Sequence, residues 1–244
     1  MYSISVAMAV YNGAEFLREQ IDSILIQLGD KDELVISYNE SVDNTLELIQ
    51  NYAKLDTRIK IYDCKKKGVL SNFENAISKC TNDLIFLSDQ DDIWEKNKIS
   101  EIVPLFQDKN ILGVCHNKIY VDKNLKFLDK EIDKQDKEKS KKNVVKLNFI
   151  KILIKNNVQG SCLVFRRDCV KYILPFPSNI PMHDSWIGSI LTIKGDLIYI
   201  NKQLLLYRMH EHNVSPKTHG SIYQMCKNRI ILLKNYIRRR KEIQ

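Results

Sequence analysis

The segment that decides the fold lies between residues 84 and 94 and reads Leu84-Ile85-Phe86-Leu87-Ser88-Asp89-Gln90-Asp91-Asp92-Ile93-Trp94. Its apolar start has the character of a buried strand, and three carboxylates and a tryptophan follow directly. Carboxylates crowded at the end of a buried strand repel one another and lose hydration, and a divalent cation relieves both costs. Hard oxygen ligands suit Mg²⁺ or Mn²⁺. The segment therefore predicts a metal and nucleotide site at the carboxyl edge of an open α/β sheet.

A plainer interpretation of the same residues is a surface turn whose acids cap the helix expected from about Glu95. The two interpretations make different demands on the rest of the chain. A capping turn needs nothing further, whereas a site needs other polar loops at the same edge of the sheet.

Strands and helices alternate along the chain before this segment. The apolar patterns predict strands at residues 3–10, 33–38, 58–63 and 83–87, separated by helices at 16–28, 44–54 and 72–79. This rhythm predicts a mostly parallel sheet flanked by helices. Polar loops follow the strand ends at residues 11–13, 39–43, 65–68 and 89–92. Because ligands bind such sheets outside the carboxyl ends of the strands, the functional interpretation is favoured.

The second half of the chain is less regular. The patterns predict helices from Trp94 to about 107, at 144–154 and from Asp184 to about 193, and strands at 111–121, 160–165, 197–200 and 204–208. Residues 129–142 are lysine-rich with almost no apolar side chains, so we expect a mobile charged loop there. Asp184 stands at a helix start, where it is either an N-cap or a functional carboxylate.

Charge and cysteine content narrow the class of protein. The 244 residues have a formal net charge of +8, which favours an anionic partner. The six cysteines form no C-x-x-C pair, which is typical of reduced thiols in a cytoplasmic protein. The N-terminus lacks the pattern of a signal peptide, and no apolar run approaches the roughly 20 residues that span a bilayer.

A basic helix is expected at the end of the chain, from about residue 220 to 241. Apolar side chains follow one of its sides, and lysines and arginines dominate the others. Such a helix either makes peripheral contact with an anionic membrane or packs on the domain or on a second copy. Nucleic acid is not expected as a partner, because few aromatic residues lie among the cations.

Four ordered motifs resemble those of the family 2 glycosyltransferases with the GT-A fold, and most of all their rhamnosyltransferase-like branch. The motifs are Val6-Ala7-Met8-Ala9-Val10-Tyr11-Asn12-Gly13, Ser88-Asp89-Gln90-Asp91-Asp92-Ile93-Trp94, Met182-His183-Asp184-Ser185-Trp186 and Tyr207-Arg208-Met209-His210. The segments 68–74 and 174–177 have similar surroundings in that branch. The likeness implies a GT-A domain over residues 1–214, with a nucleotide-binding half at 1–122 and an acceptor and catalytic half at 143–214. The basic helix would follow at 215–244.

The resemblance implies a role for each matching residue. Tyr11 and the backbone at Ala9 would line the nucleotide base, Asn39 would reach the base edge, Asn72 would lie on the nucleotide side, and Asp89 would contact the ribose side. Asp91 would hold the divalent metal, Mg²⁺ or Mn²⁺, with His210 near the metal or the diphosphate. Asp184 would be the catalytic base. The sugar and acceptor pockets would be shaped by Asp92, Trp94, His183 and Trp186.

The implied activity is transfer of a sugar, rhamnose or another hexose, from a nucleoside-diphosphate sugar of the UDP or dTDP type. The acceptor would be a hydroxyl of a glycan or lipid-linked glycan in surface polysaccharide synthesis, and the anomeric centre would be inverted. The family usually carries D-D-G-S after the second strand, where this chain has Tyr38-Asn39-Glu40-Ser41. This departure keeps a catalytically weakened sugar-nucleotide-binding protein as an alternative. A nucleotidyltransferase is disfavoured, because residues 10–15 contain one glycine and no lysine.

Overall fold

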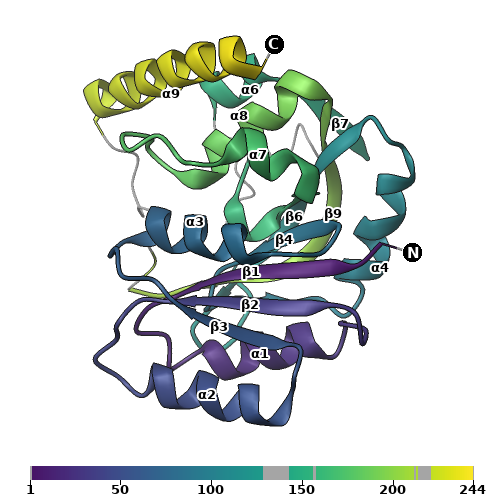
Figure 1. The fold of residues 1–244 in the computed structure, drawn as a ribbon, viewed down its shortest axis with the longest axis vertical. Coiled ribbons are helices and arrows are strands. Elements are labelled where there is room, and N and C mark those ends of the chain that lie inside the picture. The colour runs from purple at the N-terminus through teal and green to yellow at the C-terminus, as the bar shows by residue number, and fades with distance from the viewer. Residues whose placement is uncertain (1, 129–142, 156–157, 212, 214–220, 244) are drawn as a thin grey trace.

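The computed structural model describes residues 2–128, 143–155, 158–211, 213 and 221–243. They form one mixed sheet with helices on both faces (Figure 1). The charged segment 129–142 lies outside the described residues, so its expected mobility stays a prediction.

The first half of the chain supplies the parallel part of the sheet. The strands β1 (Ile4–Val10), β2 (Glu33–Tyr38), β3 (Ile59–Asp63) and β4 (Leu84–Ser88) pair in the order β3-β2-β1-β4. Helices α1 (Leu17–Leu25), α2 (Thr45–Leu55) and α3 (Val69–Lys79) connect them. The expected elements are confirmed here to within a few residues. The carboxyl ends of β1, β2 and β4 lie side by side, as a parallel sheet requires.

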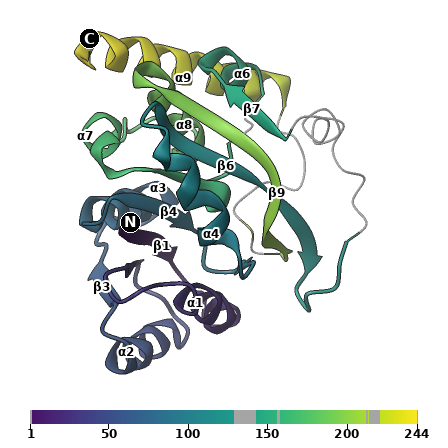
Figure 2. The same cartoon turned by 90° about the vertical axis from the view of Figure 1, so that its right-hand side faces the viewer.

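The second half extends the same sheet. The full order is β3-β2-β1-β4-β8-β6-β9-β5, and β7 pairs with the far side of β9. The bounds are β5 (Ile93–Trp94), β6 (Ile111–Asp122), β7 (Val144–Leu147), β8 (Leu163–Arg166) and β9 (Asp196–Met209). β8 runs antiparallel to both neighbours, whereas the long strands β6 and β9 run parallel and side by side (Figure 2). The end of β9 reaches the acidic segment because β5 pairs with it.

Four local expectations are wrong. The helix expected from Trp94 to about 107 is instead the end of β5, the short helix α4 (Lys98–Ile102) and a 3₁₀ helix (Val103–Gln107). Residues 144–154 are not one helix but β7 followed by the short α6 (Phe149–Ile154), because the valine-rich start pairs with β9 and the Asn148 side chain caps α6. The two strands expected at 197–200 and 204–208 are the single strand β9, whose partner β6 follows it through register shifts. Residues 160–162 form a 3₁₀ turn before β8 rather than part of the strand.

Two hydrophobic layers hold the sheet between helices. Ile4, Val6 and Met8 alternate along β1 toward the layer shared with α1 and α2. Ala7, on the opposite face, belongs to the layer shared with α3 and with α8 (His183–Lys194). Alternation with period two places successive residues of β1 in different layers. The site therefore lies at the end of strands that are fixed from both sides.

The C-terminal helix α9 (Ile222–Ile243) packs on α8 and α6 (Figure 1). The Tyr236 ring stacks on Phe149 with centroids 3.6 Å apart, and the Arg239 guanidinium donates to the carbonyls of Tyr172, Leu174 and Pro175. Packing of one side of this helix on the domain is thus confirmed. Among the described residues, no helix combines the length and apolarity that crossing a membrane requires.

Candidate functional site

A cavity of about 750 Å³ opens at the carboxyl edge of the parallel strands. Both halves of the chain contribute to its wall. Nine residues expected from the sequence line it: Ala9, Tyr11, Asn39, Asn72, Asp89, Asp91, His183, Asp184 and His210. Asp91 and Asp184, which are far apart in the sequence, therefore share one cleft.

Three carboxylates gather in this cavity. Burial and the nearby carboxylates of Asp91 and Asp184 raise the pKa of Asp89 to about 7. Negative charges held this close favour a cation in the same space. The crowding of carboxylates expected from the sequence is therefore present, and it disfavours the charged form of Asp89.

The donor atoms at one end of the cavity fit a divalent cation. His210 Nε2 lies 2.8 Å from Asp91 Oδ2. Asp91 would supply a carboxylate oxygen, the type of ligand that suits Mg²⁺ or Mn²⁺, with the His210 ring nitrogen beside it. Within the described residues no three His, Cys, Asp or Glu side chains enclose a metal by themselves. Mg²⁺ commonly keeps waters and substrate phosphates as its remaining ligands.

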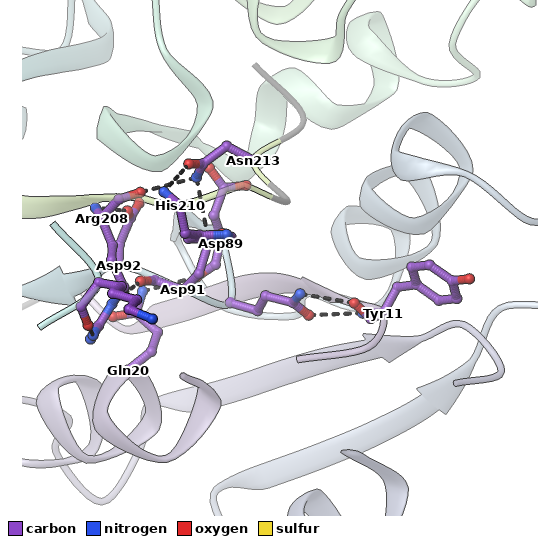
Figure 3. A network of polar contacts seen from close by, with 10 residues as sticks. Tyr11, Gln20, Asp89, Asp91, Asp92, Arg208, His210 and Asn213 are labelled. Atoms are coloured by element: carbon purple, nitrogen blue, oxygen red, sulfur yellow. Dashed lines mark hydrogen bonds and ion pairs between the residues drawn. The ribbon is translucent and has the colours of Figure 1, made fainter. Parts of the chain in front are cut away.

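Arg208, at the end of β9, fixes the acidic segment from behind (Figure 3). Its backbone N–H donates to Asp92 Oδ1 at 3.1 Å, and its Nε donates to the Asp91 carbonyl at 2.9 Å. Its Nη2 pairs with the Glu19 carboxylate of α1 at 2.5 Å. A rigid planar fork suits this simultaneous contact with several acceptors. Arg208 therefore joins α1, β9 and the acidic segment into one support for Asp91.

Another part of the cavity wall is built from backbone turns and two asparagines. Asn39 Nδ2 donates to the carbonyls of Cys64 at 2.7 Å and Lys66 at 3.2 Å. Asn72 Nδ2 donates to the Val10 carbonyl at 3.0 Å, while its buried Oδ1 has no hydrogen-bond partner among the described residues. A buried acceptor without a partner is costly unless a ligand supplies the missing donor. The Asn72 carbonyl is therefore suited to a ligand N–H or O–H.

Asp184 and His183 line the cavity from the start of α8. The N-cap position is Met182 and Asp184 lies in the first helical turn, so the N-cap interpretation of Asp184 is wrong. The His183 ring is stacked on Phe73, with centroids 4.0 Å apart, and a Cβ added to Gly160 would lie 2.5 Å from its Nε2. Burial lowers the pKa of His183 to about 3, so the imidazole is neutral at physiological pH.

Three expected residues do not line the cavity but support it. Asp92 is fully buried and bonded to Arg208, and burial followed by the nearby charges of Asp91 and Asp89 raises its pKa. Trp94 packs on Phe86 in the core. Trp186 is fully buried and its Nε1 donates to the Ile173 carbonyl at 2.9 Å. Both tryptophans follow the rule that such large apolar rings pack inside.

Residues that the sequence interpretation assigned no role also shape the site. Arg208 lies within the motif Tyr207-Arg208-Met209-His210, which gave the only sequence signal for it. Gln90 and Gln159 line the cavity wall. Lys98 is fully buried behind the site, where its Nζ donates to the Ser161 carbonyl at 2.9 Å and burial lowers its pKa to about 8. No pattern in a single sequence separates this lysine from those on the surface.

Known proteins resemble this chain in sequence. Residues 5–174 match the model of the family described as Glycosyl transferase family 2. The dTDP-rhamnosyl transferase RfbG of Shigella flexneri is 28% identical over 221 residues, which cover 84% of this chain and 72% of the relative. An uncharacterized glycosyltransferase of Nostoc sp. is 26% identical over 225 residues, or 86% of this chain and 66% of the relative.

Solved structures resemble it in fold. TarS of S. aureus (residues 1–349, in complex with UDP-GlcNAc) superposes with a TM-score of 0.73 at 14% identity, covering 96% of this chain and 67% of that one. The mannosyltransferase PcManGT of Pyrobaculum calidifontis, in complex with GDP-Man and Mn²⁺, gives a TM-score of 0.66 at 16% identity, with coverages of 87% and 58%.

The chain spans only part of several curated relatives: 66% of the Nostoc protein, 56% of the putative glycosyltransferase EpsH of Bacillus subtilis and 42% of the glycosyltransferase GlyG of Streptococcus pneumoniae. The family match nevertheless covers well over half of this chain, and it includes β1, β4 and the acidic segment. With its GT-A fold and its cleft at the carboxyl edge of the sheet, the chain belongs to glycosyl transferase family 2.

Proposed function

We propose that the protein transfers a sugar from a nucleoside-diphosphate sugar to a hydroxyl of a glycan or lipid-linked glycan in surface polysaccharide synthesis, with inversion. The observation that supports this most strongly is the shared cavity of Asp91 and Asp184. A carboxylate that holds a cation and a carboxylate that takes a proton must act on the same bound donor. One cleft of about 750 Å³ is of the size that small-molecule sites commonly have.

The nucleoside binds at the end of the cavity that Tyr11, Asn39 and Asn72 line. Nδ2 of Asn39 is engaged with backbone carbonyls, which leaves its Oδ1 as the atom available to a base N–H. A uracil or thymine ring presents one such imide N–H. A UDP or dTDP donor, with rhamnose or another hexose, fits this arrangement, and the RfbG relative is named for a dTDP donor.

The diphosphate lies toward Asp91 and His210, which would hold the divalent cation, with Asp89 beside them. When bound, Mg²⁺ or Mn²⁺ neutralises the negative charge that grows on the departing diphosphate. The chain prepares this place by keeping Asp91 fixed through Arg208 and by aiming the His210 ring at the same carboxylate. Asp89 and Asp91 thus bind and orient the donor and take no part in bond making or breaking.

Asp184 takes the proton of the acceptor hydroxyl as its oxygen attacks the anomeric carbon. A general base must reach that oxygen within about 3 Å, and Asp184 lines the same cavity as Asp89 and Asp91. Attack from the side away from the diphosphate inverts the anomeric centre. The neutral His183 beside it supplies hydrogen-bonding atoms without adding charge.

The first experiment is donor hydrolysis and transfer with a panel of UDP, dTDP and GDP sugars, each with Mn²⁺, Mg²⁺ or EDTA. We expect one pyrimidine donor to be consumed with metal and spared with EDTA. A sugar-nucleotide-binding protein without activity would bind a donor in calorimetry and consume none. A nucleotidyltransferase would instead release pyrophosphate from a nucleoside triphosphate and a sugar phosphate, and either outcome would replace the proposed reaction.

We also propose that α9 makes peripheral contact with an anionic membrane, on the cytoplasmic face. Tyr223, Ile230 and Ile237 are exposed by 75%, 52% and 46%, and their spacing of seven puts them on one side of the helix. Lys227, Lys234 and Lys241 repeat at the same spacing beside them. An apolar row next to cations suits a lipid headgroup layer.

Vesicle co-sedimentation tests this contact. The wild type should sediment with vesicles containing phosphatidylglycerol and stay free with pure phosphatidylcholine. The double variant Ile230→Gln, Ile237→Gln should lose most of the binding. Equal sedimentation of that variant would contradict the proposal without touching the proposed sugar transfer.

A further inference from the structure

Gln90 stands between two acids of the cleft, but its side chain bonds to a different loop. Its Oε1 accepts the Tyr11 backbone N–H at 2.8 Å, and its Nε2 donates to the Tyr11 carbonyl at 2.8 Å. Figure 3 shows this pair of bonds at Tyr11, away from the network of Asp91, Arg208 and His210. One side-chain amide thus pairs with both backbone groups of one residue, as a neighbouring strand would.

Tyr11 needs such a partner because β1 ends one residue earlier, at Val10. The chain then turns sharply, and Asn12 has a positive φ of 47°. On its other side the turn is held by Asn12, whose N–H donates to Ser41 Oγ at 3.0 Å and whose Oδ1 accepts the Val42 N–H at 2.9 Å. Gln90 is the contact that ties the turn to the acidic segment.

The fit of Gln90 against this turn is close. A Cβ added to Gly13 would lie 2.5 Å from Gln90 Oε1 and 2.7 Å from its Cδ. The amide therefore occupies the space that any larger residue at position 13 would need. The Tyr11 side chain, in contrast, is 52% exposed and lines the cavity. The backbone of Tyr11 is held while its ring is left free for a ligand.

We propose that Gln90 is a positioning residue that holds Tyr11 against the nucleoside and so links the base end of the cleft to the cation end. This inference rests on the proposed function. Asp89 and Asp91 flank Gln90 directly, so the backbone that sets the two acids also sets the amide that fixes Tyr11. Loss of the amide should weaken donor binding and leave the chemistry at Asp184 intact.

The variant Gln90→Leu removes both hydrogen bonds at nearly constant size. We expect its KM for the donor, and its Kd for UDP or dTDP in calorimetry, to rise about 10-fold, with kcat within about threefold of the wild type. Gln90→Glu keeps the acceptor but cannot donate to the Tyr11 carbonyl. Its KM for the donor should lie between those of the wild type and Gln90→Leu. Gln90→Glu also serves if Gln90→Leu folds poorly.

Gln27→Leu is the matched control. Gln27 is also half-buried and its side chain also bonds to the backbone, since its Nε2 donates to the Ser23 and Glu95 carbonyls at 3.0 and 3.1 Å and its Oε1 accepts the Ile99 N–H at 3.2 Å. It does not line the cavity. Its loss should lower Tm as much as Gln90→Leu does while leaving donor KM unchanged. An equal rise of KM in both variants would reduce the Gln90 effect to general destabilisation and overturn the proposal.

A double-mutant cycle with Tyr11→Ala tests whether Gln90 acts through Tyr11. Tyr11→Ala alone should raise donor KM about 10-fold, through the lost stacking on the base. In the double variant, donor KM should be less than about twofold above that of Gln90→Leu alone, because the Tyr11 ring is already misplaced when Gln90 is lost. Two effects that multiply would overturn the proposal, as would an unchanged KM in Tyr11→Ala. The proposed sugar transfer would stand in both cases, since it depends on Asp91 and Asp184.

Discussion

The two edges of the parallel sheet treat a buried acid in opposite ways. At the amino edge, Glu33 begins β2 and is 2% exposed. Its Oε1 accepts from Ser5 Oγ at 2.6 Å and from the N–H and Oγ1 of Thr81 at 2.7 and 2.8 Å, while its Oε2 pairs with Lys60 Nζ at 2.5 Å. Burial would raise the pKa of Glu33, but hydrogen bonds from Lys60, Ser5 and Thr81 outweigh it and lower the pKa.

At the carboxyl edge, Asp89 ends up beside two further carboxylates, and burial together with Asp91 and Asp184 raises its pKa to about 7. The same sheet thus holds one acid, Glu33, whose charged form the protein stabilises, and another, Asp89, whose charged form burial and the neighbouring carboxylates disfavour. A carboxylate whose pKa is raised by burial and by like-charged neighbours in a cleft is typical of functional sites. The contrast indicates that the acids of the carboxyl edge are kept for a ligand.

The largest effect is expected from Asp184→Asn. Loss of the base should lower kcat about 100-fold or more while leaving donor KM near its original value. Steady-state kinetics with the preferred donor measures both. The exposed Asp168→Asn serves as the matched control and should change neither. Full turnover by Asp184→Asn would show that this residue has no catalytic role. It would also remove the main functional difference between the acids of the two edges.

Asp91→Ala should act on binding. We expect the affinity for UDP or dTDP in the presence of Mn²⁺ to fall about 10-fold or more, to the level found in EDTA, as the loss of a metal ligand implies. Calorimetry of wild type and variant, each with and without Mn²⁺, separates the two contributions. A variant that still binds the nucleotide more tightly with Mn²⁺ would show that the cation lies elsewhere.

Glu33→Gln should lower the stability of the fold without affecting catalysis, because Glu33 at the amino edge has a structural role only. The amide leaves hydrogen-bond donors unmatched, so we expect a loss of about 1–3 kcal/mol in the free energy of unfolding at pH 7. The folded-state pKa of Glu33 lies below its ordinary value of 4.5, so its stabilisation is present above that pH and is lost as pH falls through the lowered pKa. The gap between wild type and variant should therefore narrow in acid.

Urea denaturation from pH 3 to pH 7 measures this gap, and the exposed Glu47→Gln is its control. Catalysis by Glu33→Gln should be unchanged after correction for unfolded protein. A gap that widens in acid would contradict the account of Glu33.

The smallest effect is expected from Asp89→Asn at the carboxyl edge. Because a neutral amide does not repel Asp91 or Asp184, the free energy of unfolding at pH 8 should stay within about 0.5 kcal/mol of the wild type or rise above it. Urea denaturation of the metal-free protein measures the change. A loss of unfolding free energy as large as that of Glu33→Gln would show that the protein stabilises the charge of Asp89 as it does that of Glu33, and would contradict the proposed difference between the two edges.

The sequence predicts the parallel half of this fold because its strands are short, apolar and separated by amphipathic helices. The same pattern places Asp89 and Asn39 at one edge, since only strand direction is needed. The apolar pattern fails where strand pairing determines the secondary structure. The Val144–Leu147 segment has helical apolar spacing, yet it forms a strand because it pairs with β9.

The site is predicted only as far as its motifs reach. Asp91, Asp184 and His210 stand in recognisable surroundings and do line the cleft. The tryptophans Trp94 and Trp186 share those motifs but are buried, because side-chain direction depends on packing that the sequence does not display. The contacts of Gln90 with Tyr11 and of Arg208 with Asp91 join residues 79 and 117 positions apart, so no local pattern announces them.

The central claim is that Asp91 and Asp184 serve one bound donor. Anomalous diffraction from crystals grown with Mn²⁺ and UDP or dTDP tests it most directly. We expect a manganese peak within bonding distance of Asp91 and His210, with the diphosphate reaching into the cavity toward Asp184. A manganese peak or a nucleotide bound outside this cavity would contradict it.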